Sequence, residues 1–159
     1  MTVGFRRKRN RLPLGMYSQN RAYLLTLRCA AGARALEEHA FTRQCIDALR
    51  RYSEKHRLGI MAYCFMPDHL HLLLQGRPGA SVPDFVKEFK QRTGYDYRQA
   101  HGRQLWQKSY HDHILRGEED VERVARYVIG NPVRAGLVRH AEDYPYSGSF
   151  VWGQAIMEA

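Results

Sequence analysis

Hydrophobic and polar positions alternate most regularly in two apolar runs that flank Pro67-Asp68. A proline followed by an aspartate is typical of a turn, so the two runs are predicted to pair as an antiparallel hairpin between Gly59 and Gly76. Successive side chains of a strand point to opposite faces, which gives the second strand one apolar and one polar face. The apolar face holds Leu70, Leu72 and Leu74, and the polar face holds His69, His71 and Gln75.

Apolar spacing predicts three elements around this hairpin. The run at 22–29 indicates a mostly buried strand, and apolar residues at helical spacing indicate a helix over 41–56. A second helix is predicted to begin directly after Ser81, because Ser81 and Asp84 have the spacing of a capping box.

Two more elements are predicted beyond the second helix. The stretch 106–115 is the fourth expected strand. A third helix follows the acidic residues 118–120, since negative charge is favourable at a helix N-terminus. It is expected to end at Asn131-Pro132, because the residue before a proline avoids the helical region. Its apolar side is formed by Val121, Val124 and Val128.

This order of elements predicts an α+β fold, a βαββαβ sandwich with an added C-terminal helix. Both crossover helices would cover one face of the sheet. The histidine pair would lie on the other face, where the third helix can approach. We expect a basic N-terminal arm over 1–20, a single domain over 21–150 and a short C-terminal tail over 151–159.

The charge balance favours a polyanionic partner. The chain has 25 Lys and Arg against 16 Asp and Glu, a net charge of +9 and a pI near 9.7. Nucleic acid is expected before membrane, because no apolar run approaches the roughly 20 residues of a spanning helix. The N-terminus lacks the apolar region of a secretory signal, so a cytoplasmic protein is expected. Cys29, Cys45 and Cys64 are predicted to be reduced and buried.

Two cationic surfaces are candidate phosphate contacts. The first is the N-terminal cluster, which either lies along phosphates or only solubilises the terminus. The second is the outer face of the second helix, which either contacts phosphate or is an ordinary solvated face. The candidate residues are Arg6, Arg7, Lys8 and Arg9 in the cluster, and Lys87, Lys90 and Gln91 on the helix.

The histidine pair and the third helix carry the candidate chemistry. Neutral imidazoles side by side on one strand face can share a divalent metal, although two solvated polar residues are an alternative. Tyr127 and Asn131 are four residues apart, hence on one side of a helix. Over the histidines they could supply a nucleophile and a third metal ligand. The alternatives are an ordinary packed aromatic and a common Asn-Pro turn.

Several motifs in a fixed order carry a family resemblance. They are Met66-Pro67-Asp68-His69-Leu70-His71-Leu72-Leu73, Trp106 with Tyr110-x-Asp112-His113-x-Leu115-Arg116, Tyr127-x-x-x-Asn131-Pro132-Val133-Arg134-Ala135-Gly136-Leu137, and Asp143-Tyr144-Pro145-Tyr146-Ser147. Together they resemble the single-tyrosine HUH transposases, named for a His-hydrophobe-His pair. Within that family the likeness is to the REP-associated tyrosine transposases, relatives of the IS200-like elements. It covers about residues 20 to 150.

The resemblance implies a ferredoxin-like fold and metal-dependent DNA cleavage. The histidine pair would hold Mg²⁺ or Mn²⁺, and Tyr127 would attack DNA, leaving a 5′-phosphotyrosine. Asn131 occupies the position of a Gln ligand in some relatives, with a side chain one methylene shorter. The implied partner is single-stranded or hairpin DNA, with Arg134 as a further contact. Monomer and homodimer both remain open, because relatives can place the tyrosine helix in a partner's site.

Two roles stay open within this resemblance. A phenol has an ordinary pKa near 10, so another group must accept its proton. His111 and His113 are candidates, and the alternative is that they contact DNA or the fold. Four aromatic residues either stack on unpaired bases or belong to the core. They are Trp106, Tyr110, Tyr144 and Tyr146.

Two other functions remain as alternatives. One is a nicking endonuclease of the replication-initiator or relaxase kind, against which the short chain and the Asn131–Leu137 motif argue. The other is a ferredoxin-like nucleic-acid-binding module without activity.

Overall fold

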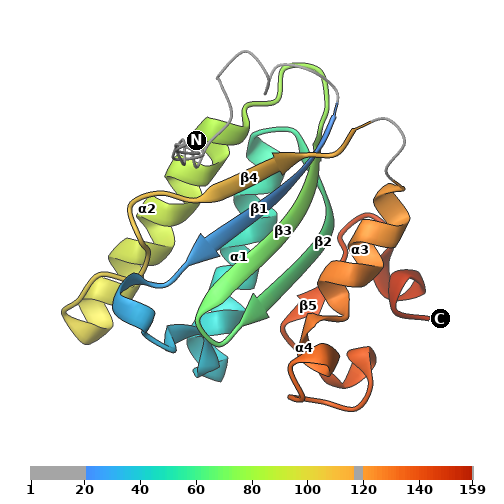
Figure 1. Ribbon diagram of the computed structural model, residues 1–159. Coiled ribbons are helices and arrows are strands. Elements are labelled where there is room, and N and C mark those ends of the chain that lie inside the picture. The colour runs from blue at the N-terminus through green and yellow to red at the C-terminus, as the bar shows by residue number, and fades with distance from the viewer. Residues whose placement is uncertain (1–20, 117–119, 159) are drawn as a thin grey trace, which may run out of the picture.

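The computed structural model describes residues 21–116 and 120–158 and contains one five-stranded sheet. The strand order is β4-β1-β3-β2-β5, and all neighbouring strands are antiparallel (Figure 1). The first four strands have the ferredoxin-like βαββαβ connectivity that was predicted. The strands are β1 (Ala22–Arg28), β2 (Leu58–Met66), β3 (His69–Gly76), β4 (His111–Ile114) and β5 (Ser147–Gly148).

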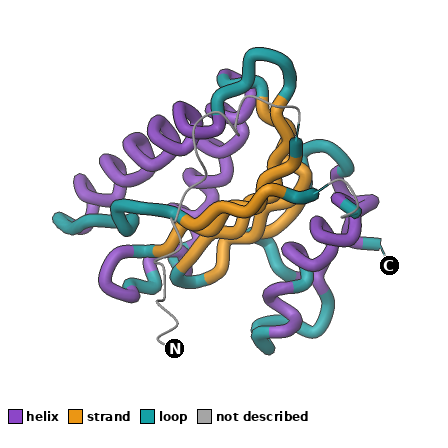
Figure 2. Tube along the Cα trace, turned by 45° about the horizontal axis from the view of Figure 1, so that its top comes forward, coloured by secondary structure: helices purple, strands orange, loops and turns teal. Residues whose placement is uncertain are grey.

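Four α-helices accompany the sheet, and they divide between its two faces (Figure 2). The two helices that connect strands of the βαββαβ unit, α1 and α2, lie side by side on one face of the sheet. Helix α3 lies on the other face (Figure 1). The helices are α1 (His39–Lys55), α2 (Val82–His101), α3 (Val121–Ile129) and α4 (Asn131–Arg134). Short 3-10 turns occur at Ala30–Gly32, Ala35–Glu37, Ala141–Asp143 and Gly153–Met157.

Strand alternation separates two apolar clusters. The side chains of Leu70, Leu72 and Leu74 are fully buried with the inner faces of α1 and α2, as expected. Leu73 has the opposite orientation and is buried beneath α3 with Val128. The histidine pair therefore shares its side of the sheet with α3, which is the arrangement that the sequence predicted.

Helix α2 begins and ends with local signals that the sequence carries. The Ser81 hydroxyl accepts a hydrogen bond from the Asp84 backbone N–H at 3.3 Å, which satisfies a donor of the first turn. Pro83 lies in that first turn, where its missing N–H costs nothing. Gly102 ends the helix with φ of 70°, a left-handed conformation that glycine adopts without strain.

The fourth strand is shorter than predicted. Strand β4 begins at His111, and the expected strand over 106–115 was wrong in its first half. Trp106 instead makes one isolated bridge with Cys29, and its indole N–H donates to the Thr93 hydroxyl at 2.9 Å. The backbone around Trp106 still pairs with the continuation of β1, since the Ala30 N–H donates to the Leu105 carbonyl oxygen at 2.7 Å and the Gln107 N–H donates to the Arg28 carbonyl oxygen at 2.9 Å. The interruption of the ladder therefore falls between Gln107 and His111.

The end of the third helix also differs from the prediction. Helix α3 ends at Ile129, and Asn131 is the first residue of the separate helix α4. Pro132 does not exclude a helical Asn131, because a proline in the first turn of a new helix needs no N–H partner. Tyr127 and Asn131 therefore lie on consecutive helices and not on one.

The segment after α4 packs against the same side of the sheet as α3. The last turn, Gly153–Met157, buries Ile156 in the cluster beneath α3. The Arg126 guanidinium donates to the carbonyl oxygens of Ile156 and Glu158 at 3.0 and 2.7 Å. The residues that were expected to form a tail are thus tied to α3 as far as 158.

Two compositional predictions concern the described residues. The three cysteines are free and buried, as expected, and burial raises the pKa of the Cys29 and Cys64 thiols to about 12. Along 21–116 and 120–158, no helix combines the length and apolar character needed to cross a bilayer.

Candidate active site

His69 and His71 face each other on the open side of strand β3. Their Nε2 atoms lie 3.0 Å apart, and their rings are nearly perpendicular with centroids 4.6 Å apart. Two residues apart on a strand, they share one face, and the pleat brings the rings together. Both residues of the pair are half-buried.

The second nitrogen of each ring has a partner of its own. His69 Nδ1 lies 2.6 Å from Asp68 Oδ1, and His71 Nδ1 lies 3.1 Å from the Thr26 hydroxyl. Thr26 reaches His71 because the two residues are directly paired across β1 and β3. When both Nδ1 atoms carry the proton, both Nε2 lone pairs point into the same space, an arrangement that a cation stabilises.

The electrostatics of the pair favour a neutral His71. Burial lowers the pKa of His71 to about 4, with smaller contributions from His69, Arg28 and Arg134. The hydrogen bond with His69 holds the pKa of the Asp68 carboxyl below its usual range. A neutral imidazole is the state of His71 that metal ligation requires. A carboxylate on the other ring nitrogen, as Asp68 provides for His69, orients a ligating imidazole.

The spacing of the two nitrogens fits a shared metal ion. Two nitrogens that each lie about 2.1 Å from one cation, at a right angle to each other, are about 3.0 Å apart. Within the described residues, no group of three or more His, Cys, Asp or Glu side chains could hold a metal. Further ligands would therefore be amide, phosphate or water oxygens, which suit Mg²⁺ and Mn²⁺.

Tyr127 lies in the last turns of α3 and is accessible to solvent. Its side chain is 61% exposed, although other residues of the helix are buried against the sheet. The ring contributes to a cavity of about 320 Å³ over β1 and β4. The residues that line this cavity are Leu24, His113, Leu115, Arg123, Val124 and Tyr127.

Arg134 joins Tyr127 to Asn131. Its guanidinium carbon lies 3.8 Å from the centroid of the Tyr127 ring, a cation–π contact. Its Nη2 atom donates to the Tyr127 carbonyl oxygen at 2.6 Å and to Asn131 Oδ1 at 2.7 Å. The Asn131 amide oxygen, which was predicted to be a metal ligand, thus accepts a hydrogen bond from Arg134.

Most of the chain matches the sequence model of one protein family. The family described as "Transposase IS200 like" matches residues 18–131, a span that includes β1, the histidine pair and Tyr127. The chain belongs to the IS200-like transposase family.

Three proteins of similar sequence are also named as transposases. A Haemophilus influenzae protein named as a REP-associated tyrosine transposase is 28% identical over 113 residues, which is 64% of this chain and 64% of that protein. The REP-associated tyrosine transposase of Escherichia coli is 26% identical over 92 residues, 55% of this chain and 52% of its own length. The ISDra2 transposase TnpA of Deinococcus radiodurans is 38% identical over 72 residues, 40% of this chain and 51% of its own. The chain thus matches between half and two thirds of each relative's length.

Solved structures of this kind share the fold. A REP-associated tyrosine transposase bound to a REP hairpin superposes with a TM-score of 0.68 at 21% identity, covering 82% of this chain and 78% of that one. A Deinococcus radiodurans transposase gives a TM-score of 0.53 at 22% identity, over 84% of this chain and 97% of that one. The predicted fold and family are confirmed.

In this IS200-like transposase, the predicted helix contacts lie on the opposite side from the histidine pair. Lys87 and Gln91 are exposed on α2, which covers the other face of the sheet. Lys90 donates to the backbone carbonyls of Gln107 and Lys108 at 2.7 and 3.2 Å. Lys90 thereby holds the segment before β4. Arg6, Arg7, Lys8 and Arg9 lie outside the described residues.

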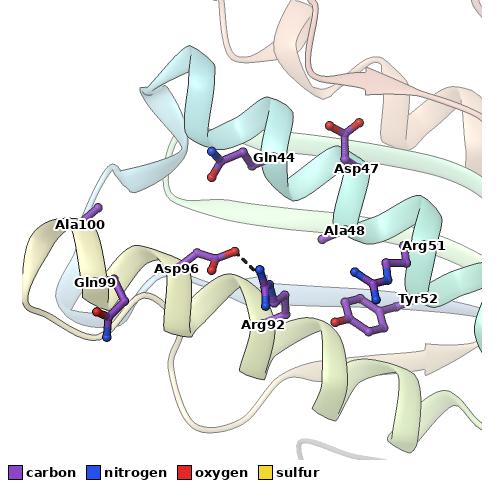
Figure 3. A pocket seen from close by; sticks show the side chains of 9 residues that line it. All are labelled: Gln44, Asp47, Ala48, Arg51, Tyr52, Arg92, Asp96, Gln99 and Ala100. Atoms are coloured by element: carbon purple, nitrogen blue, oxygen red, sulfur yellow. Dashed lines mark ion pairs between the residues drawn. The ribbon is translucent and has the colours of Figure 1, made fainter.

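The outer helical face also carries a cavity between α1 and α2 (Figure 3). Its rim mixes both signs of charge: α1 contributes Asp47 and Arg51, and on α2 Arg92 is paired with Asp96 at 3.3 Å. A mixed rim offers a polyanion no net attraction. This cavity is therefore a poor candidate for a DNA-binding surface.

The aromatic residues separate into core and surface. Trp106, Tyr110 and Tyr144 are buried, so the alternative in which they stack on bases was wrong for these three. Each fills part of a cluster, and the Tyr144 hydroxyl also donates to the Phe65 carbonyl oxygen. Tyr146 is half-buried, and its hydroxyl lies 2.9 Å from His39 Nδ1.

Sequence reasoning missed three partners in this site. Asp68 was assigned only to the turn, yet its carboxylate holds His69. Thr26 had no signal of its own, although the β1–β3 pairing brings it opposite His71. Arg134 was predicted to contact DNA, and it contacts Tyr127 and Asn131 within the chain.

Proposed function

We propose that this protein cleaves and rejoins single-stranded DNA that contains a hairpin, through a 5′-phosphotyrosine intermediate formed on Tyr127. The observation that carries the proposal is the pair of Nε2 atoms 3.0 Å apart on the sheet face that α3 covers with an accessible tyrosine. The family is one of transposases, and a structural neighbour is bound to a REP hairpin.

His69 and His71 would hold a divalent cation, Mg²⁺ or Mn²⁺. When bound there, the cation supplies positive charge to a non-bridging oxygen of the scissile phosphate. Asp68 and Thr26 orient the two rings through their Nδ1 atoms. The amide oxygen of Asn131 has two lone pairs, and Arg134 donates a hydrogen bond to one of them. The other lone pair would be the one that binds the cation.

The chemical step is an in-line displacement at phosphorus. The Tyr127 oxygen forms a bond to the phosphorus while the bond to the 3′ oxygen breaks. The phenol proton passes to a base, and the leaving 3′ oxygen takes up a proton to become a hydroxyl. The phosphodiester energy is kept in the phosphotyrosine, so a 3′-hydroxyl can reverse the step without ATP.

His113 is the proposed acceptor of the phenol proton. Of the two imidazoles considered on β4, His113 is the one that lines the cavity containing Tyr127. Imidazole is the side chain best suited to accept a proton near neutral pH.

The experiment is an adduct assay. Labelled single-stranded hairpin DNA is incubated with the protein and Mn²⁺, and a denaturation-resistant protein–DNA adduct is sought on a gel. We expect an adduct from wild type that disappears in Tyr127→Phe and after chelation, while hairpin binding persists. Tyr95→Phe is the matched control, because Tyr95 is 60% exposed on α2 and should leave the adduct unchanged.

Two outcomes of this assay contradict the proposal. An adduct that survives Tyr127→Phe assigns the nucleophile to another residue. A wild-type protein that binds the hairpin but gives no adduct with any metal favours a nucleic-acid-binding module.

The site is proposed to be completed within one chain. Helix α3 packs on β2 and β3 of its own sheet and buries Ala125, Val128 and Ile129 there. A mixture of Tyr127→Phe with His71→Ala should therefore remain inactive. Recovered adduct in that mixture would show that a tyrosine from one chain serves the histidines of another.

A further inference from the structure

Tyr127 lies two residues before the end of helix α3. Helix α3 ends at Ile129, and the last turn of a helix has carbonyl groups without intrahelical partners. A nucleophile in such a turn needs an additional constraint, because a misplacement of about 1 Å costs roughly 100-fold in rate.

Arg134 supplies that constraint through three contacts at once. Its Nη2 atom satisfies the free carbonyl of Tyr127 at 2.6 Å, and its guanidinium plane covers the Tyr127 ring at 3.8 Å. The same Nη2 atom holds the amide oxygen of Asn131 at 2.7 Å. One side chain thus fixes the backbone and the ring of the proposed nucleophile, together with its neighbour on α4.

Gly130 leaves the space that the Arg134 side chain occupies. A Cβ atom built at Gly130 would lie 2.8 Å from Arg134 Nη1, so the end of the Arg134 side chain would have to shift. The backbone of Gly130, at φ of −75° and ψ of −7°, is one that any residue adopts. A methyl group at this position would displace the guanidinium, and it would also lie 3.2 Å from the Arg126 carbonyl oxygen, so glycine leaves the guanidinium its place.

We propose that Arg134 is a positioning residue, which holds the Tyr127 ring and the Asn131 amide in their reactive orientation, and that Gly130 makes room for it. The inference rests on the proposed function of Tyr127 and goes beyond it. The guanidinium acts through Tyr127 and Asn131, so its loss should slow adduct formation more than it weakens hairpin binding. Lysine should not substitute for it, because an ammonium group has neither the planar fork nor the stacking surface.

The test uses two independent ways to remove the contact. Arg134→Ala deletes the guanidinium, and Gly130→Ala displaces it while Arg134 stays in the chain. For each full-length variant, the single-turnover rate of adduct formation is measured at saturating hairpin DNA, alongside the hairpin dissociation constant and the melting temperature. Arg139→Ala is the matched control for the loss of one exposed positive charge near α4.

We expect both variants to form the adduct roughly 10- to 100-fold more slowly than wild type. We expect hairpin affinity to change no more than in Arg139→Ala. Gly130→Ala also brings a methyl group to 3.2 Å from the Arg126 carbonyl oxygen, so its rate should fall by more than its change in melting temperature accounts for. In the double variant, Gly130→Ala should add little to Arg134→Ala, because the group that it displaces is already absent.

The possible outcomes separate this inference from the proposed function. Absence of an adduct in wild type contradicts the proposed function itself. A wild-type adduct with unchanged rates in Arg134→Ala and Gly130→Ala overturns the positioning role alone. Rates that fall only in parallel with hairpin affinity would make Arg134 a DNA contact, and rates that follow only the melting temperature would make it a helix cap.

Discussion

The two faces of the sheet are built from alternate residues of the same strands, yet they serve different purposes. On one face, leucines of β3 and the aromatic residues of α2 form a closed apolar cluster. On the other, α3 covers Ala62 and Leu73 but leaves the histidine pair half-buried. Because side chains alternate along a strand, neighbouring residues of β3 can serve a hydrophobic core on one face of the sheet and a polar site on the other.

The closed face should carry most of the stability. Phe89 is fully buried there, and the centroid of its ring lies 5.9 Å from that of Phe85 and 6.1 Å from that of Trp106. Phe89→Ala should lower the free energy of unfolding by about 3–5 kcal/mol, because it leaves a cavity in the cluster. Urea unfolding measures this, with Tyr95→Ala on the exposed side of α2 as the control. Comparable losses in the two variants would contradict a packed core beneath α2.

The open face should make stability depend on pH. The folded pKa of His71 is about 4 against an ordinary 6.5, so between these values the unfolded chain binds a proton that the folded chain does not. The free energy of unfolding should therefore fall as pH falls through this window, by up to about 1.4 kcal/mol per pH unit.

Urea unfolding at several pH values, in the presence of a chelator, measures this dependence. His71→Asn should flatten the curve between pH 6.5 and 4, while Phe89→Ala should shift it downward without changing its slope. An unchanged slope in His71→Asn would assign the dependence to other groups.

The partners of the histidines should affect metal binding without affecting the core. Asp68→Ala should weaken Mn²⁺ binding about 10- to 100-fold, because the carboxylate orients the His69 ring. Titration calorimetry measures the affinity, and Thr26→Val should give a smaller loss, since a hydroxyl carries no charge. Asp47→Ala, on the helical face, is the control. Equal affinities in wild type and Asp68→Ala would refute the orienting role.

The smallest effect should come from the start of α2. Ser81→Ala removes the acceptor for the Asp84 N–H and should lower the free energy of unfolding by about 1 kcal/mol. Thermal melting measures it, and Ser81→Asn should retain the cap and most of the stability. The rate of adduct formation should stay the same in both variants, because α2 lies across the sheet from Tyr127.

The fold could be predicted from the sequence because its signals are local. The Pro67-Asp68 turn and the alternation after it specify the hairpin, and Ser81 marks the start of α2. The prediction was wrong where a distant contact decided the outcome. Thr93 on α2 binds the indole of Trp106, and the residues between Trp106 and His111 leave the ladder with β1.

The candidate site was predictable only where neighbours in sequence are neighbours in space. His69 and His71 meet because a strand repeats every two residues. Thr26 could be found only from the register of β1 against β3, which spacing along the chain does not give. The contact of Arg134 with Tyr127 depends on the angle between α3 and α4, and Pro132 was expected to end a helix, not to begin one.

The ends of the sheet have a consequence for self-association. At one margin β5 has only two residues, and at the other β4 has four, including the exposed His111 and His113. Short, polar edge strands offer a second molecule few backbone groups for hydrogen bonding. This protects against strand pairing between two copies of the protein. Among the described strands, the long apolar ones all lie inside the sheet, so the face with the histidine pair can stay partly uncovered without exposing a long apolar edge strand.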